Sequence, residues 1–391
     1  MAGALLLAPD AARAQAAPGG WTEIEVPAGN GAMAHNLASS GRGILLSWLE
    51  SRGAGGHALR VARLDRQRFV PLGTVAEGAR FFANWADFPA VVESGDGTLL
   101  AHWLAKTGPD TYAYSVELAR SVDGGVTWKP LGPLHADGVA AEHGFVAFAA
   151  EDRAVRAVWL DGRSMPGGGP MALRTARVEG EQVTGEQLLD ERVCDCCQTG
   201  VAMATGGPVV VYRDRSPEEI RDMAVVRRSG SGWSSPAPVH RDGWRIPGSP
   251  VNGPVIAAAG RRVAVAWFTG AEKQPRVQVA FSEDGGVRFG APILVDGERP
   301  LGRVGMALDA DGSALVSWLA SEGGDAAILA RRATPAGVGP PLRLAQTAQA
   351  RASGFPRILV EDGRLYVAFV EGDKGSRLRA GSVPTSALPP P

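Results

Sequence analysis

Apolar runs recur along the chain at nearly constant spacing, and each ends in an aromatic residue. Each run follows a strand-like segment and a turn that contains Gly or Pro, as at 43–48 and 97–103. Short runs of this kind, bounded by turn residues, are typical of β-strands. The closing aromatics lie 51 to 56 residues apart and are Trp48, Trp103, Trp159, Tyr212, Trp267, Trp318 and Phe369. This period is the length of a four-stranded blade, so the pattern predicts an all-β protein with a single β-propeller. Seven repeats favour seven blades, and six remain possible if one repeat is an insertion.

In this arrangement the last repeat lacks an outer strand, and the N-terminal segment can supply it. After each aromatic comes a loop and a third strand, as at 59–63 and 173–177. The last repeat has its third strand near 378–383 and then runs into a Pro-rich tail at 386–391. A spare strand at 21–26 can supply the missing outer strand, which would remove open sheet edges. We therefore expect one propeller domain over 21–385, closed by an N-terminal strand.

The first sixteen residues resemble the second half of a secretory signal peptide. A short apolar run at 4–8 is followed by small residues, with a possible cleavage site near Ala14 or Ala16. The basic segment that usually opens such a peptide is missing, so a plain Ala-rich tail is the alternative. We expect an exported protein, periplasmic or extracellular, without a transmembrane segment.

The net charge gives no reason to expect a nucleic acid or an anionic membrane as a partner. The chain has 40 Lys and Arg against 41 Asp and Glu, a formal net charge of −1. Nothing in this balance favours nucleic acid or an anionic membrane. We expect a monomer whose partner is a small molecule, a glycan or another protein.

Two copies of one turn motif stand in equivalent repeats. The first reads Ser-Val-Asp-Gly-Gly-Val-Thr-Trp at 121–128, and the second, Ser-Glu-Asp-Gly-Gly-Val-Arg-Phe, lies at 282–289. The Asp can accept backbone N–H groups inside its own turn, and the Gly pair permits positive φ. The motif resembles the Asp box of sialidases and other bacterial-neuraminidase-repeat (BNR) proteins, which implies a sialidase-like propeller with the boxes on its periphery. The residues that match are Ser121, Asp123, Gly125, Thr127 and Trp128, then Ser282, Asp284, Gly286 and Phe289.

The catalytic pattern of that family is not evident. The resemblance implies three arginines for a substrate carboxylate, a Tyr nucleophile backed by Glu, and an Asp as acid or base. Arg303 and Arg357 are two possible clamp members, whereas the third has no clear candidate. The tyrosines stand in strand patterns without a visible nucleophile setting. Sialidase activity is therefore not expected.

Polar residues stand where the innermost strand of each repeat begins. If seven blades surround one axis, these residues converge on the mouth of one central funnel. The alternative is that a funnel rim is polar only because it is wet. They are His35, Asn36, Asn84, Trp85, Asp87, Glu142, His143, Cys196, Cys197, Gln198, Asn252, Arg303 and Arg357.

The only three cysteines of the chain are Cys194, Cys196 and Cys197. Three interpretations remain open for this group. It can hold a structural disulfide with one thiol left over. It can bind a soft metal, copper(I) or zinc, together with His143 or His35. It can also supply a redox or nucleophilic thiol. The sequence further resembles exported bacterial sialidase-like proteins that carry this Cys-Asp-Cys-Cys stretch.

Two functions follow as hypotheses. The first is a non-enzymatic propeller that binds a ligand, copper or zinc, or a protein at its cysteine-bearing funnel. The second is a glycoside hydrolase or lyase acting on acidic glycans. In the second, Asp87, Glu142 and His143 serve as acid and base groups, and Arg303 and Arg357 hold a carboxylate.

Overall fold

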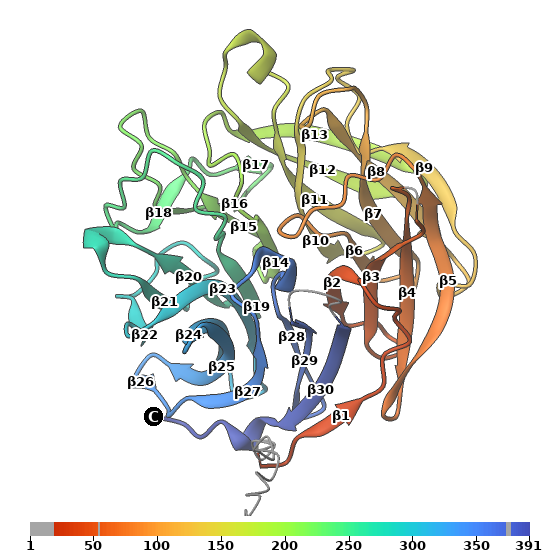
Figure 1. Ribbon diagram of the computed structural model, residues 1–391. Helices are drawn as coiled ribbons and strands as arrows, with labels where there is room; N and C mark the ends of the chain where they lie inside the picture. Colours follow the sequence, from red (N-terminus) through yellow and green to blue (C-terminus); the bar gives the residue numbers. More distant parts are fainter. Residues whose placement is uncertain (1–18, 54, 373–376) are drawn as a thin grey trace, which may run out of the picture.

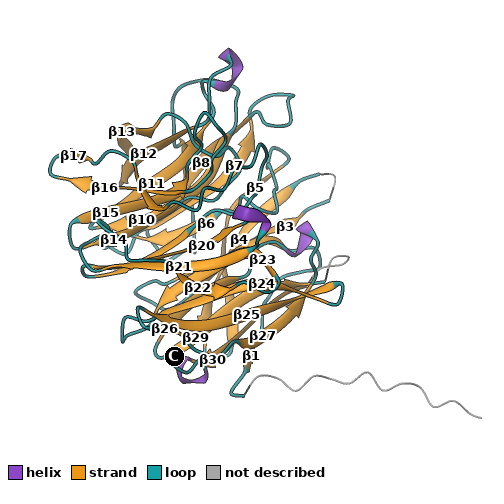
Figure 2. Ribbon diagram, turned by 90° about the vertical axis from the view of Figure 1, so that its left-hand side faces the viewer, coloured by secondary structure: helices purple, strands orange, loops and turns teal. Residues whose placement is uncertain are grey.

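The protein is a seven-bladed β-propeller. The computed structural model describes residues 19–53, 55–372 and 377–391, in which seven antiparallel sheets form a ring (Figure 1). Each sheet follows a four-stranded path from an innermost to an outermost strand. Figure 2 shows that the rest is loop, apart from a few single helical turns. The prediction of seven blades is confirmed.

The first three blades follow the chain in simple order. Blade 1 contains β2 (Met33–Ala38), β3 (Leu45–Ser51), β4 (His57–Asp65) and β5 (Arg68–Gly78). Blade 2 contains β6 (Ala90–Glu93), β7 (Leu99–Lys106), β8 (Tyr114–Ser121) and β9 (Lys129–Pro133). Blade 3 contains β10 (His143–Glu151), β11 (Ala154–Asp161), β12 (Ala172–Glu179) and β13 (Gln182–Asp190).

In blades 4 and 6 the outer strand is split into two pieces. Blade 4 contains β14 (Gly200–Ala204), β15 (Gly207–Arg213), β16 (Met223–Ser229), β17 (Gly232–Trp233) and β18 (Ala237–His240). Blade 5 contains β19 (Val255–Ala259), β20 (Arg262–Thr269), β21 (Arg276–Ser282) and β22 (Ile293–Asp296). Blade 6 contains β23 (Pro300–Leu308), β24 (Ala314–Glu322), β25 (Asp325–Thr334), β26 (Gly337–Val338) and β27 (Leu342–Thr347).

Blade 7 joins the two ends of the chain. It contains β28 (Arg357–Glu361), β29 (Arg364–Glu371), β30 (Arg377–Pro384) and, as its outermost strand, β1 (Thr22–Ile24). Thr22 pairs with Ser382 and Ile24 with Ala380, and the strands β1 and β30 lie side by side at the bottom of Figure 1. The predicted closure by an N-terminal strand is confirmed. Four helical turns lie in loops: η1 (Met165–Gly167), η2 (Ala271–Lys273), η3 (Arg351–Ser353) and η4 (Thr385–Ala387).

The hydrophobic core lies between neighbouring blades. Each closing aromatic stands in the second strand of its blade, and six of the seven are buried, with Trp103 half-buried. One cluster joins Val158 of blade 3 to Tyr212 of blade 4, and another joins Val279 of blade 5 to Trp318 of blade 6. The period seen in the sequence is thus the period of this inter-blade packing.

Both Asp-box motifs form the predicted turns at the outer part of a blade. The first links β8 to β9, and Asp123 accepts hydrogen bonds from the backbone N–H groups of Val126 and Thr127, at 3.0 Å each. The second links β21 to β22, where Asp284 accepts the N–H groups of Val287 and Arg288. Both glycines of each motif have positive φ, which supports the conformation expected of these turns.

The structure describes the predicted C-terminal tail but not the predicted signal-peptide segment. The signal-peptide segment 1–16 lies outside the described residues. In the tail at 386–391, Leu388 is fully buried and packs in the core beside blade 7. Among the described residues no helix has the length and apolar character needed to cross a membrane.

Candidate functional site

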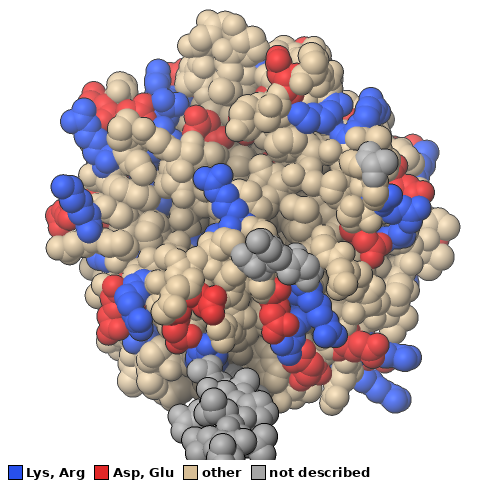
Figure 3. Space-filling view, in the orientation of Figure 1, with Lys and Arg blue, Asp and Glu red and all other residues tan. Residues whose placement is uncertain are grey.

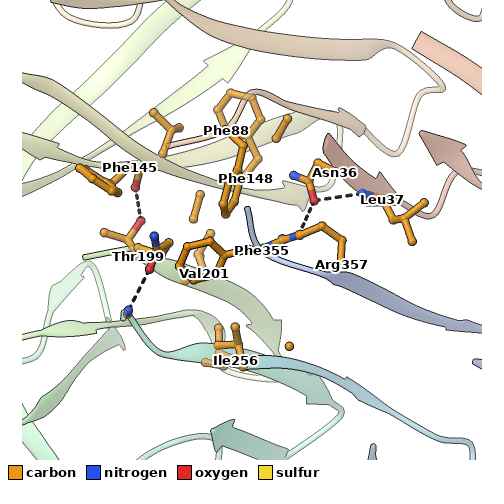
Figure 4. A pocket seen from close by; sticks show the side chains of 18 of the residues that line it. Asn36, Leu37, Phe88, Phe145, Phe148, Thr199, Val201, Ile256, Phe355 and Arg357 are labelled. Carbon is orange, nitrogen blue, oxygen red and sulfur yellow. Dashed lines mark hydrogen bonds between the residues drawn. The ribbon is translucent and has the colours of Figure 1, made fainter. Parts of the chain in front are cut away.

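A cavity of about 240 Å³ lies on the propeller axis, lined by residues of all seven innermost strands. Its wall is mixed, and Phe88, Phe148 and Phe355 are among the apolar residues that line it (Figure 4). Polar groups are contributed by Asn36, Asp87, Gln198, Thr199 and Arg357. A concave wall that combines aromatic side chains with several convergent polar groups is a candidate small-ligand site.

Arg357 brings a positive charge into this cavity. Its Nε donates to Asn36 Oδ1 at 2.8 Å, and its guanidinium lies 4.7 Å from the centre of the Phe88 ring (Figure 4). Burial lowers the pKa of Arg357 to about 10. Within the described residues it forms no ion pair with a carboxylate. A half-buried cation without a carboxylate partner favours an anionic ligand in this position.

Asp87 lines the same cavity and is 3% exposed. Its Oδ2 accepts the backbone N–H of Phe145 at 2.8 Å. Burial raises the pKa of Asp87 to about 8, despite that hydrogen bond, and the charge of Glu142 adds to the effect. At neutral pH the carboxyl group is therefore mostly protonated and able to donate a proton.

Several of the polar strand-start residues join neighbouring blades. Phe145 and Arg303 both have positive φ, 52° each, within irregular pairings of β10 and β23. This conformation turns the N–H of Phe145 to Asp87, and that of Arg303 to Asn252 Oδ1 at 2.7 Å. Gln198 Oε1 likewise accepts the N–H of Gly253 at 2.9 Å. Bulged positions of this kind re-aim groups next to a site.

Glu142 is paired with a tyrosine behind the cavity. Tyr114 donates its hydroxyl to Glu142 Oε1 at 2.7 Å, and its ring stacks on Phe82. Burial raises the pKa of Glu142 to about 7 and also raises that of Tyr114. Tyr114 is 1% exposed and does not line the cavity. Sequence reasoning missed this pair because 28 residues separate its members and Tyr114 follows a plain strand pattern.

Arg303 and His35 lie near the funnel in structural roles. The Arg303 guanidinium donates to the carbonyls of Gln349, Ala350 and Gly354 and to Ser353 Oγ, so it holds the loop that contains η3. His35 Nε2 lies 3.0 Å from the carbonyl of Ala368, and burial lowers the His35 pKa to about 4. His35 is therefore neutral in the folded protein.

The three cysteines form one compact sulfur cluster before β14. All three Sγ atoms lie within 4.8 Å of one another, and those of Cys194 and Cys196 are 3.8 Å apart. All three are free thiols, so the disulfide, one of the three interpretations left open by the sequence, is not present in this structure. Cys194 and Cys197 are buried, while Cys196 is half-buried.

Two buried arginines surround this cluster with positive charge. Arg221, 3% exposed, donates from Nη1 to the sulfur of Cys194 at 3.4 Å. Arg213, 1% exposed, donates to the carbonyls of Asn252, Arg221 and Phe268, and it pairs with no carboxylate in the described part of the chain. Such charges favour the thiolate form of Cys194.

The pKa values of the thiols diverge accordingly. Burial alone would raise the pKa of Cys194, but hydrogen bonds from Cys196 and Cys197 and the charge of Arg213 bring it well below its usual value. The hydrogen bond with Cys194 raises the pKa of Cys196 to about 12, and burial raises that of Cys197. Cys194 is therefore the thiol of the cluster that ionises first.

The proposed histidine partners do not join the sulfur cluster. His143 groups instead with His135 and Asp137, whereas His35 lies against Ala368 in blade 7. The metal-ligand set expected from the sequence is thus divided between three places. His135 and Asp137 were not among the expected residues, because they stand in the linker between β9 and β10 and show no repeat signal.

The face seen in Figure 3 carries both signs of charge interspersed around the ring. Basic and acidic residues lie next to one another over most blades, without a continuous patch of one sign on this face. This distribution agrees with the near-neutral net charge.

Solved structures share this fold with the chain. An ulvan lyase of polysaccharide lyase family PL25, solved with a glucuronic acid–sulfated rhamnose unit, aligns with a TM-score of 0.61 and 10% identity over 91% of this chain and 95% of the lyase. The GH93 α-L-arabinofuranosidase of Fusarium graminearum, solved with arabinobiose, aligns at 0.54 and 13% identity over 94% of this chain and 98% of that enzyme. No family model and no curated protein matches the sequence.

These likenesses define the class as a β-propeller of the kind also found in glycoside hydrolases and polysaccharide lyases. At such identities they establish the fold and not the activity. Membership of the sialidase superfamily stays a prediction from the two Asp boxes.

Proposed function

We propose that this protein is an exported propeller that binds a soft metal ion, copper(I) or zinc, at Cys194, Cys196 and Cys197. The observation that carries the proposal is the placement of three sulfur atoms within 4.8 Å of one another. Zinc–sulfur bonds of about 2.3 Å in a tetrahedral site place neighbouring sulfurs about 3.8 Å apart. The Cys194 and Cys196 sulfurs already have this spacing.

The charges around the cluster support the same function. Metal binding needs thiolates, and burying several of them without compensation is unfavourable. Arg213 supplies a buried positive charge that favours the Cys194 thiolate, and Arg221, which also pairs with Glu219 and Asp195, donates a hydrogen bond to the Cys194 sulfur. Soft thiolate ligands select copper(I) or zinc over harder ions. Because the cluster precedes β14 and the cavity-lining Gln198, a bound ion would lie close to the funnel.

Elemental analysis with thiol counting tests the proposal. Protein purified without chelator should contain copper or zinc bound through sulfur, and the variant C194S/C196S/C197S should contain about one equivalent of metal per chain less than wild type. His35→Gln is the control, since His35 lies away from the sulfurs and its loss should leave the metal in place. A folded wild type that neither carries nor takes up either metal at micromolar concentration would refute the proposal, and one free thiol in that protein would indicate a disulfide instead.

A second candidate function is the processing of acidic glycans in the axial cavity. The observation that favours it is the pairing of an unneutralised Arg357 with a protonated Asp87 on one cavity wall. Arg357 would hold a substrate carboxylate and Asp87 would act as general acid. The wild type should then turn over a uronide or a sialoside, with loss of turnover in Asp87→Asn and a raised KM in Arg357→Gln. An inert wild type across such a panel would exclude this function.

A further inference from the structure

His143 is a fully buried histidine with one ring nitrogen lacking a partner. Its Nδ1 lies 3.2 Å from the carbonyl of Tyr114 and 3.1 Å from that of Ala141. Both neighbours only accept hydrogen bonds, so Nδ1 carries the hydrogen and donates it. Nε2 is left with its lone pair, and within the described residues it has no hydrogen-bond partner.

This nitrogen faces two carboxylates. Nε2 of His143 lies 3.3 Å from Asp137 Oδ2 and 3.8 Å from Asp161 Oδ1. The side chains of Asp137 and Asp161 are 7% and 0% exposed. A lone pair against two buried carboxylates is unfavourable, and the Arg163 guanidinium that pairs with both carboxylates does not reach Nε2, so a cation between Nε2 and the carboxylates would be stabilising. That cation is either a proton on Nε2 or a metal ion.

The spacing of the three atoms matches a zinc site. Nitrogen and oxygen ligands at about 2.0 Å from zinc in a tetrahedral arrangement lie about 3.3 Å from each other. The distance from His143 Nε2 to Asp137 Oδ2 has this value, and the distance to Asp161 Oδ1 is slightly longer. A ligating histidine usually donates its other N–H to a carbonyl, as His143 does here.

Two further residues orient the carboxylates. His135 accepts the N–H of Val116 on Nε2 at 3.4 Å, so its Nδ1 carries hydrogen and donates to Asp137 Oδ2 at 2.6 Å. His135 is therefore a support for Asp137 and not a ligand. Arg163 holds Asp161 in a bidentate ion pair, from Nε to Oδ1 and from Nη2 to Oδ2 at 2.7 Å each, and its Nη2 lies 3.4 Å from Asp137 Oδ2.

We propose that His143 Nε2, Asp137 and Asp161 bind a zinc-like divalent cation. Asp137 belongs to the linker between blades 2 and 3, His143 begins β10 and Asp161 ends β11. The ion therefore ties the inter-blade linker to the two inner strands of blade 3. This site uses neither the cysteines nor the axial cavity, so it is independent of the proposed function.

The test starts from C194S/C196S/C197S, in which no thiol can bind metal. This protein is stripped of metal, equilibrated with Zn²⁺ at pH 7.5 and desalted, and its zinc content is measured. About one retained equivalent is expected, and Asp161→Asn in the same background should lower the zinc affinity at least about tenfold. Asp296→Asn is the matched control, because Asp161 and Asp296 each accept a tryptophan Nε1–H, at 2.8 and 2.7 Å, and Asp296 lies in blade 5.

A second measurement covers the case in which the Asp161 variant does not fold. Co²⁺ replaces zinc in the cysteine-free protein, and its absorption spectrum should show tetrahedral nitrogen and oxygen ligation. A folded cysteine-free protein that retains neither ion, with both His143 ring nitrogens protonated in ¹⁵N NMR spectra at pH 7.5, would overturn the inference. That outcome would leave the proposed cysteine site untested, because the cysteine-free protein lacks it, and the metal content of wild type decides that site separately.

Discussion

The guanidinium of Arg221 donates a hydrogen bond to the sulfur of Cys194 at 3.4 Å, and both side chains are buried. Arg221 also pairs with Glu219 at 2.8 Å and with Asp195 at 3.3 Å, so its orientation is held by two carboxylates. The cation is therefore fixed at the sulfur cluster before any ion arrives, which reduces the cost of forming a thiolate there.

Replacing Arg221 by Gln should raise the pH at which the first thiol ionises. Losing a cation in direct contact with a buried thiolate is expected to shift this pKa upward by about one unit or more. Thiolate absorbance of the metal-free protein, followed against pH, measures the change. Arg228→Gln, on β16 and away from the cysteines, is the control, and an unchanged midpoint in Arg221→Gln would show that the arginine does not set the thiolate.

Asp87 should make the protein less stable as pH rises. Burial raises its folded-state pKa from 3.8 to about 8, so its favourable contribution is complete below pH 3.8 and is lost as pH rises through about 8. Relative to Asp87→Asn, wild type should lose up to about 1.4 kcal/mol of unfolding free energy per pH unit in that interval. Urea unfolding at several pH values tests this.

Asn at position 87 keeps an acceptor for the Phe145 N–H, so the variant isolates ionisation from hydrogen bonding. Parallel stability curves of wild type and variant across this interval would mean that Asp87 does not titrate there.

The two Asp boxes should contribute unequally to stability. Asp123 accepts hydrogen bonds from Thr127 Oγ1 and Ser121 Oγ in addition to its two backbone donors. Asp284 has the equivalent serine, but Arg288 replaces the threonine. Asp123→Ala should therefore lower Tm more than Asp284→Ala in calorimetry. Equal shifts would indicate that the threonine adds nothing to the turn.

Ring closure should depend on Ile24. This residue of β1 is 3% exposed and packs in the core between blades 7 and 1. Ile24→Ala should lower the unfolding free energy by about 2–4 kcal/mol, as expected for a buried aliphatic side chain. The neighbouring Glu25 is exposed, and Glu25→Ala should change stability by less than about 0.5 kcal/mol. Denaturant unfolding of both variants measures the difference, and similar values for the two would show that β1 is not part of the cooperative unit.

The strand-start residues show how far sequence reasoning reaches into the site. Their convergence on the funnel follows from the repeat, and Asn36, Asp87, Gln198 and Arg357 do line the axial cavity. The repeat does not show which of these side chains are free to bind a ligand. The Arg303 guanidinium donates to the loop that contains η3 and does not line the cavity, while Arg357 lines the cavity and donates there to Asn36.

The sequence alone determined the architecture, because blade packing repeats the same local pattern seven times. Aromatic spacing, the Gly-containing turns and the spare N-terminal strand each carry that information locally. The side-chain partnerships of the site were decided only by the tertiary structure. Tyr114 with Glu142, Arg221 with Cys194 and His143 with Asp161 join positions 18 to 28 residues apart, on different strands and loops. The orientation of groups in the site depends on bulges and on positive φ at residues such as Phe145. The periodic pattern of the sequence does not predict these local conformations.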